Sequence, residues 1–192
     1  TTITASQAGN TNYSAATPVP QNLLVNNTSL LPQTITGHSL TDTKTYGAAP
    51  YNLTSTGGGS GNPVTYNSDN PLVATTTGLN GATITIVGAG TANITASQAG
   101  NGSYNPAPDV IQALTVLQKD ITVSGAVADN KPYDGTNTAT ITGGSLQVLE
   151  PGDVVTFSGG GTFSSSDAGT WPVTTALVLG GADQAKYNLI QP

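Results

Sequence analysis

Apolar residues recur along the chain in short alternating runs separated by turn residues. Ile84 and Ile86 alternate with Thr83 and Thr85, so one face of residues 82–87 is apolar and the other is hydroxylated. Strict alternation is typical of a strand with one buried face. The same criterion predicts these strands in this part of the chain: residues 33–37, 51–55, 64–67, 72–76, 82–87, 92–96 and 110–116.

Seven short strands at turn spacing favour an antiparallel β-sandwich of the immunoglobulin type over residues 28–117. The connections between the strands are rich in Gly, Pro and Asn, for example at residues 57–63, 70–71 and 88–90. These residue types set the backbone angles of tight turns, and they interrupt any longer strand or helix. Residues 28–117 are therefore predicted to be one complete β-domain.

An internal repeat is the most informative feature of the sequence. Residues 1–25 and 92–116 align without gaps at an offset of 91 and agree at 14 of 25 positions, and the block ITASQAGN is identical in both. We interpret residues 1–27 as the C-terminal strands of a preceding repeat. Their apolar side chains at Ile3, Val19, Leu23 and Val25 then need a partner, which is either upstream sequence or another copy of the chain.

The character of the sequence changes after Leu117. Seven of the ten carboxylates and three of the four lysines lie in residues 118–192. Strands are predicted at residues 121–128, 137–142, 154–158, 173–179 and 187–190, with one helical turn near 182–186. Residues 118–192 are predicted to be a second, small β-rich domain. Because the junction at 117–120 has no Gly or Pro, we expect stiff coupling and an elongated rod.

Composition excludes several functional classes. Only 7% of residues are charged, the net charge is −6, and there is no Cys. Nucleic-acid binding needs clustered Lys or Arg, so it is not expected. No apolar run is long enough to insert into a membrane. An acidic chain without Cys is typical of a protein exposed outside the cell, where thiols are not kept reduced.

Two family resemblances follow from the motifs. The stretch NSDNPLVATTTG followed by GATITIVGAGTANITA resembles bacterial immunoglobulin-like repeats of group 2. NKPYDGT, GDVVTF, DAGT and LGGADQAKYNL, in that order, are similar to a YDG domain. These resemblances imply large secreted or cell-surface, adhesin-like bacterial proteins. At Thr45-Tyr46-Gly47 the family pattern continues with an acid, but this chain has Ala48, which argues against an ionic role for that turn.

No catalytic, cofactor-binding or metal-binding residue is assigned. His38 is the only histidine, and no partner for it can be identified. Asp134 in PYDG favours a turn closed by Gly135 over a ligand role, and the acids Asp153, Asp167 and Asp183 are interpreted in the same way. Ca²⁺ in the last domain or between domains stays open, although no two acids stand within two positions of each other.

The aromatic residues admit two interpretations. Trp171 and the tyrosines could form a carbohydrate-stacking platform, but Trp171 leads into an apolar-alternating strand, which favours core or hairpin packing. Tyr13 and Tyr104 recur at one repeat position, where a buried ring that ties down a loop is the preferred explanation. Surface clustering of Trp171 with tyrosines would favour glycan binding.

The sequence therefore predicts a non-catalytic structural segment, not an enzyme. We expect a stalk or fibre in a secreted or surface-bound bacterial protein that spaces or presents a binding region. Its expected partners are neighbouring repeats or copies of itself, with a surface glycan or another host or cell-surface ligand as a further partner. The alternatives are a glycan-binding module and an accessory domain of a secreted glycan-degrading enzyme.

Overall fold

The structure is a computed structural model that describes residues 2–23, 29–40 and 43–192. Nearly all of its regular structure is β, as the sequence predicts. The first strands are β1 (Thr2–Ala5), β2 (Val19–Asn22), β3 (Lys44–Thr45), β4 (Tyr51–Asn52), β5 (Val64–Ser68), β6 (Ala74–Thr77) and β7 (Thr83–Ile86). They are followed by β8 (Gly90–Gln98), β9 (Val110–Leu117), β10 (Lys119–Ala128), β11 (Thr138–Gln147), β12 (Thr156–Phe163), β13 (Val173–Gly180) and β14 (Tyr187–Ile190).

Two sheets form the middle unit, residues 29–117. One has the order β3-β9-β8-β5 and the other β4-β7-β6. Both contribute to one hydrophobic core, in which Ile84 of β7, Ile94 of β8 and Leu114 of β9 have no exposed surface. The two-sheet arrangement agrees with the predicted sandwich. Parallel pairing of β3 with β9 departs from the purely antiparallel arrangement that was expected.

The strand predicted at residues 33–37 does not form. Within it only Thr36 makes an isolated bridge, to Thr56. Gln33 instead uses its side chain, which accepts from the Ser60 amide and donates to the Ala99 carbonyl, and Gly37 has a φ of 74°. The side chain of Gln33 is committed to a loop, and Gly37 has a left-handed backbone. Both features interrupt the hydrogen-bonded ladder of a β-strand. The strand predicted at residues 51–55 forms only over Tyr51–Asn52, which is β4.

The repeat in the sequence is a repeat in the backbone. β1 pairs with β2 so that Ile3 lies opposite Gln21, and β8 pairs with β9 so that Ile94 lies opposite Gln112, which is the same register. The loops match as well: the Asn10 amide donates to the Tyr13 carbonyl over 2.8 Å, and the Asn101 amide donates to the Tyr104 carbonyl over 2.9 Å. The duplicated sequence therefore specifies one hairpin twice.

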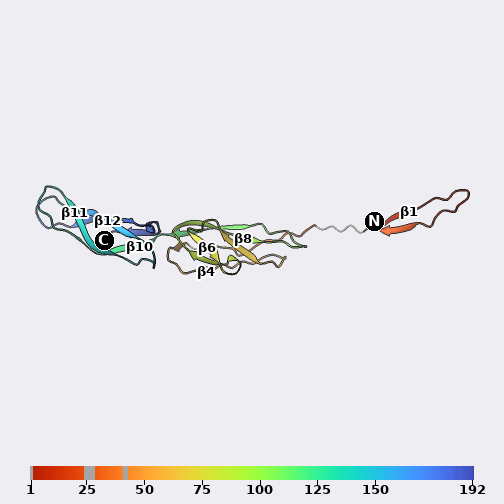
Figure 1. Cartoon of the computed structure of the whole chain (residues 1–192), viewed down its shortest axis with the longest axis horizontal. Coiled ribbons are helices and arrows are strands. Elements are labelled where there is room, and N and C mark those ends of the chain that lie inside the picture. The colour runs from red at the N-terminus through yellow and green to blue at the C-terminus, as the bar shows by residue number, and fades with distance from the viewer. Residues whose placement is uncertain (1, 24–28, 41–42) are drawn as a thin grey trace.

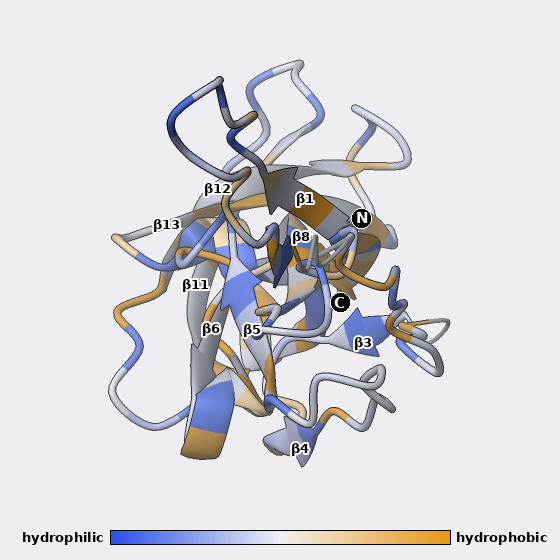
Figure 2. Cartoon of the chain, turned by 90° about the vertical axis from the view of Figure 1, so that its right-hand side faces the viewer, coloured by the Kyte–Doolittle hydropathy of each residue, from blue (hydrophilic) through white to orange (hydrophobic). Residues whose placement is uncertain are grey.

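The two copies differ in what covers them. β8 and β9 lie between β5 and β3, whereas β1 and β2 form a two-stranded sheet. Every described residue of the first hairpin is exposed; Ile3 is 59% exposed where Ile94 is fully buried. A hydrophobic band is visible on β1 in Figure 2. The apolar partner predicted for Ile3, Val19 and Leu23 is thus not provided by the described residues, and Val25 lies outside them.

Residues 118–192 form a five-stranded sheet in the order β13-β12-β11-β10-β14. This sheet follows the middle unit end to end, and Figure 1 shows the region of β10–β12 next to the region of β4, β6 and β8 along the long axis. The strands at 137–142 and 154–158 extend further than the sequence predicts, to β11 and β12. The helical turn expected near 182–186 is present as Gln184–Lys186. No helix in the described residues has the length or apolar character to cross a membrane.

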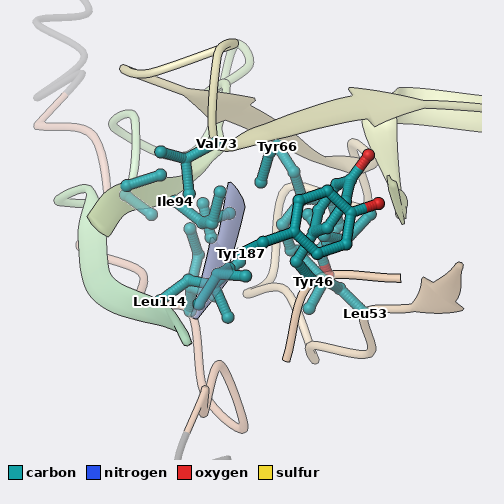
Figure 3. Packing of buried hydrophobic residues seen from close by; sticks show 14 of the residues in the cluster. Tyr46, Leu53, Tyr66, Val73, Ile94, Leu114 and Tyr187 are labelled. Atoms are coloured by element: carbon teal, nitrogen blue, oxygen red, sulfur yellow. The ribbon is translucent and has the colours of Figure 1, made fainter. Parts of the chain in front are cut away.

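The hydrophobic core continues across the junction between the two units. Ile121 of β10 and Tyr187 of β14 belong to the same buried cluster as Ile94 and Leu114, and Figure 3 shows part of this cluster. Leucines of the last unit, including Leu149, Leu179 and Leu189, pack against it from that side. The junction is therefore a packed interface and not a solvated linker.

Gly81 is expected to tolerate alanine less well than Gly61, because only Gly81 is also crowded. Both have left-handed backbones, with φ of 73° and 70°. A Cβ at Gly81 would overlap the Tyr66 carbonyl oxygen, whereas one at Gly61 meets nothing within 4 Å. Gly61→Ala should cost about 1–2 kcal/mol from backbone strain alone. Gly81→Ala should cost clearly more in denaturant unfolding, and equal losses would show that the close approach is unimportant.

Candidate functional site: a junction cluster and a surface groove

The chain crosses from one unit to the other along a nearly continuous strand. β9 ends at Leu117 and β10 begins at Lys119. On one side of this crossing, the Tyr46 amide donates to the Leu117 carbonyl over 2.9 Å, next to the parallel pairing of β3 with β9. On the other side, β14 pairs in parallel with β10, with Tyr187 opposite Lys119. Two tyrosines from distant segments thus flank the crossing.

The rings of these tyrosines pack edge to face, with centroids 5.5 Å apart (Figure 3). Both rings are almost fully buried, with Tyr46 8% and Tyr187 2% exposed. Edge-to-face packing brings the positive ring edge of one residue against the negative face of the other. The contact joins the turn that follows β3 in the middle unit to the start of β14 in the last unit.

One carboxylate, that of Asp153, binds both tyrosines. Its Oδ2 accepts from the Tyr46 hydroxyl over 2.8 Å and from the Tyr187 hydroxyl over 2.6 Å. Its Oδ1 accepts from the Lys186 ammonium over 3.1 Å. The Tyr187 hydroxyl also accepts from the Glu150 amide over 2.8 Å. We call Tyr46, Asp153, Lys186 and Tyr187 the junction cluster.

Lys186 supplies the positive charge of the junction cluster. Its ammonium donates to Asp153, to Asp183 over 2.9 Å and to the Tyr46 hydroxyl over 3.2 Å, which uses all three of its protons. It also lies 5.0 Å from the centre of the Tyr46 ring. Asp153 and Asp183 could together be read as ligands of a cation, but both carboxylates are bound to Lys186. A second pair, Lys119 with Glu150, lies at the same crossing.

The pKa values in the junction cluster follow from this arrangement. Burial raises the pKa of Asp153, but hydrogen bonds from Tyr187, Tyr46 and Lys186 outweigh it and hold that pKa below its usual value. Burial, reinforced by the hydrogen bond to Asp153, raises the pKa of Tyr187 to about 12 and also raises that of Tyr46. The hydrogen bond to Asp183 raises the pKa of Lys186. The cluster is thus set to hold one carboxylate, one ammonium and two neutral phenols.

These shifts predict that stability falls on both sides of a neutral plateau. The folded state lowers the pKa of Asp153, so its contribution is complete above the unfolded pKa near 4 and is lost as the pH falls through the folded value. Tyr187 has a raised pKa, so its contribution is complete below about 10 and is lost as the pH rises through about 12. Urea unfolding between pH 2 and 12, compared with Asp153→Asn, checks this. An unchanged acid limb in the variant would contradict the assignment.

The only histidine lies in the core. His38 is 7% exposed, its Nε2 lies 3.1 Å from the Ile94 carbonyl oxygen, and its ring packs at a tilt of 44° against that of Tyr66, with centroids 5.7 Å apart. The carbonyl requires the tautomer that carries a proton on Nε2. Within residues 2–23, 29–40 and 43–192, no acid or hydroxyl is hydrogen-bonded to this ring. Among the described residues, no three His, Asp or Glu side chains are placed to hold a metal ion.

A groove opens on the last unit, away from the junction cluster. It has a volume of about 310 Å³ and is formed by two loops. One wall is Asn130–Asp134 with Thr136, and the other contains Phe163, Ser165–Gly169 and Trp171. Residues of the PYDG and DAGT motifs line these walls, so two motifs that begin 35 positions apart in the sequence face one another.

The PYDG wall is the turn that the sequence predicts. Asp134 Oδ1 accepts from the Thr136 amide over 2.8 Å, and Gly135 follows with a φ of 73°. The Lys131 ammonium also donates to Asp134 Oδ1, over 2.9 Å. That interaction, together with the Thr136 amide, lowers the pKa of Asp134 to about 2. Asp134 is therefore ionised at all physiological pH values.

Trp171 packs within its hairpin but remains accessible. Its indole nitrogen donates to the Asp167 carbonyl over 2.8 Å, yet the residue is 40% exposed. Of the core or hairpin packing favoured for Trp171 over a stacking platform, the structure shows hairpin packing and not burial in the core. The prediction of a buried ring is wrong for Tyr13, which is 75% exposed and closes its loop through the backbone, whereas Tyr104 is half-buried with its ring against Gly59.

Sequence reasoning missed the junction cluster. It interpreted Asp153 and Asp183 as turn residues and gave Tyr46 no ionic role because Ala48 replaces an acid. The structure corrects this: the acid that Tyr46 binds is Asp153, 107 positions away. A local motif cannot show such a partner. The enrichment of lysines and acids after residue 118 was the feature of the sequence that indicated ion pairs in this part of the chain.

The comparisons with known proteins concern the second half of the chain. Residues 117–192 match the family model of the YDG domain. The match includes β10–β14, Asp153, Lys186 and Tyr187 of the junction cluster, and both walls of the groove. No curated protein matches the chain. The resemblance of the preceding residues to immunoglobulin-like repeats stays a prediction.

Proposed function

We propose that this chain is a non-catalytic structural segment of a large extracellular bacterial surface protein, a stalk or fibre that spaces or presents a binding region. The observation that carries this proposal is the junction. A shared hydrophobic core and a cluster of four buried or half-buried polar side chains join successive β-units. A stalk needs such joints, because a flexible linker would not hold a distal region at a fixed distance.

The first hairpin supports the proposed partners. It has the register of β8 and β9, with apolar residues at Ile3 and Leu23 where the second copy buries Ile94 and Leu114. β8 and β9 bury these positions by lying in a four-stranded sheet opposite a three-stranded one. We propose that the hairpin is completed in the same way, by a β-unit of this kind. Tandem immunoglobulin-like repeats would provide such units.

Spin-label distances test the stiffness of the joint. Because the chain has no cysteine, Asn67→Cys on β5 and Thr140→Cys on β11 give a doubly labelled protein with one label per unit. Both positions are exposed. We expect a single narrow distance distribution in electron–electron double resonance. It should broaden when Tyr46→Phe removes the hydroxyl that contacts Asp153 and Lys186.

The matched control is Tyr13→Phe, which changes an exposed tyrosine outside the junction and should leave the distribution unchanged. A broad distribution in the unmodified sequence would contradict a stiff joint. It would leave the chain as a string of independently oriented units, and the stalk proposal would lose its structural basis.

A further inference from the structure

The groove of the last unit presents an unusual set of exposed groups. Tyr133 is 73% exposed and Trp171 40% exposed, and they stand on opposite walls. A large aromatic ring that stays at the surface does not gain the free energy that burial of its apolar area would provide. Their placement in a groove whose volume is about 310 Å³, within the usual range of small-molecule sites, suggests a ligand with an apolar face.

The walls of the groove are held in place before any ligand binds. The hydrogen bond from the indole nitrogen to the Asp167 carbonyl fixes the plane of Trp171, and Gly169 lies so close that a Cβ there would be 3.0 Å from that nitrogen. On the other wall, Asp134 Oδ1 binds Lys131 and the Thr136 amide. A pre-organised site loses less conformational entropy on binding.

Several polar groups in the groove remain available. The carboxylate of Asp167 and Oδ2 of Asp134 have no partner among residues 43–192, where both walls lie, and neither does the Asn130 amide or the Tyr133 hydroxyl. Carboxylates and amides are the acceptors and donors that suit vicinal hydroxyl groups. The groove thus combines aromatic faces with hydroxyl-binding groups.

Charge restricts the ligand further. The one cation in the groove, Lys131, donates to Asp134 Oδ1, to the Thr136 carbonyl and to the Thr136 hydroxyl, so its three protons are used. The free charged groups are carboxylates, and the chain as a whole carries a net charge of −6. An anionic ligand would meet repulsion and no free cation. Among the described residues no three His, Asp or Glu side chains converge to hold a metal ion, and the groove has only two carboxylates, so a neutral ligand fits it better than a cation.

We propose that the groove between residues 130–136 and 163–171 binds a neutral hexopyranose unit of a glycan, with a C–H face of the sugar against Trp171 and its hydroxyls on Asp167 and Asp134. Tyr133 closes the opposite side. This gives the segment a binding role of its own, independent of the stalk. Binding through one ring is weak, so the glycan would be held by many copies or in cooperation with neighbouring units.

The single tryptophan makes the test specific. In a ¹⁵N-labelled sample of the full chain, Trp171 gives the only indole N–H signal. We would titrate cellotetraose, chitotetraose and mannotetraose separately, with tetragalacturonate as the anionic control and CaCl₂ as the cation control. The expected result is a saturable shift of the indole signal and of residues 130–136 with at least one neutral tetrasaccharide.

Three variants locate the binding. Trp171→Ala should weaken it about tenfold or more, followed through the amides of residues 130–136, because the ring is the main contact. Asp167→Ala removes an exposed carboxylate and leaves the ring and its backbone acceptor, so it should weaken binding without altering stability. Tyr13→Ala removes an exposed tyrosine elsewhere and should leave binding unchanged.

The proposal is overturned if none of the three neutral tetrasaccharides shifts these signals, or if only tetragalacturonate or Ca²⁺ does. It is also overturned if Asp167→Ala and Trp171→Ala bind as the unmodified chain does. The stalk proposal is independent of these outcomes, because it depends on spin-label distances across the junction cluster.

Discussion

Replacing Asp153 with alanine is expected to lower the free energy of unfolding by about 3 kcal/mol, the scale for removing one partner of a buried charged network. The side chain is 10% exposed and accepts from both tyrosine hydroxyls and from Lys186. Its removal leaves two phenols and an ammonium with fewer partners in a nearly dry interface. Urea denaturation at pH 7 measures the loss.

The chain contains a matched control for this prediction. Asp134 also binds a lysine, but its side chain is 51% exposed. Water replaces most of what an exposed ion pair loses, so Asp134→Ala should cost much less than Asp153→Ala. Equal losses would show that the burial of the junction cluster contributes nothing, and would weaken the view of the junction as a joint.

Ile94→Ala is expected to lower the free energy of unfolding by about 2–5 kcal/mol, the range for a large aliphatic residue truncated to alanine in a packed core. Ile94 has no exposed surface and lies in the centre of β8. The repeat supplies a close counterpart, because Ile3 is followed by the same residues, TASQAGN, and has the same register but is 59% exposed.

Ile3→Ala should therefore change the free energy of unfolding of residues 29–192 by less than about 0.5 kcal/mol. Chemical denaturation of both variants, followed by Trp171 fluorescence, makes the comparison. A large loss for Ile3→Ala would mean that the first hairpin is packed in solution against something that the described residues do not include.

The sequence predicted correctly those strands and turns that are determined by residues close together in the chain. The alternation around Ile84 and Ile94 predicted their strands, because a period of two places one face in the core. The PYDG motif predicted the turn, because the Asp134 carboxylate accepts from the amide of Thr136 and Gly135 has a positive φ. The repeat predicted the shared register of β1–β2 and β8–β9.

Non-local partners were not predictable in this way. The junction-cluster residues that the Tyr46 side chain contacts lie more than 100 positions along the chain, and the parallel pairings of β3 with β9 and of β10 with β14 leave no period in the sequence. Gln33 looked like a strand residue because its loop partners, Ser60 and Ala99, are distant. The groove depends on two loops meeting, which again no single segment encodes.

Coincidence of two unfolding transitions tests most directly whether the junction cluster makes the two units act as one. Trp171 fluorescence reports on residues 118–192, and the methyl signals of Ile94 report on the middle unit in the same urea series. We expect one shared midpoint, which separates into two in Tyr46→Phe as the joint weakens. Two separate midpoints in the unmodified chain would contradict it, because the units would then unfold as independent domains.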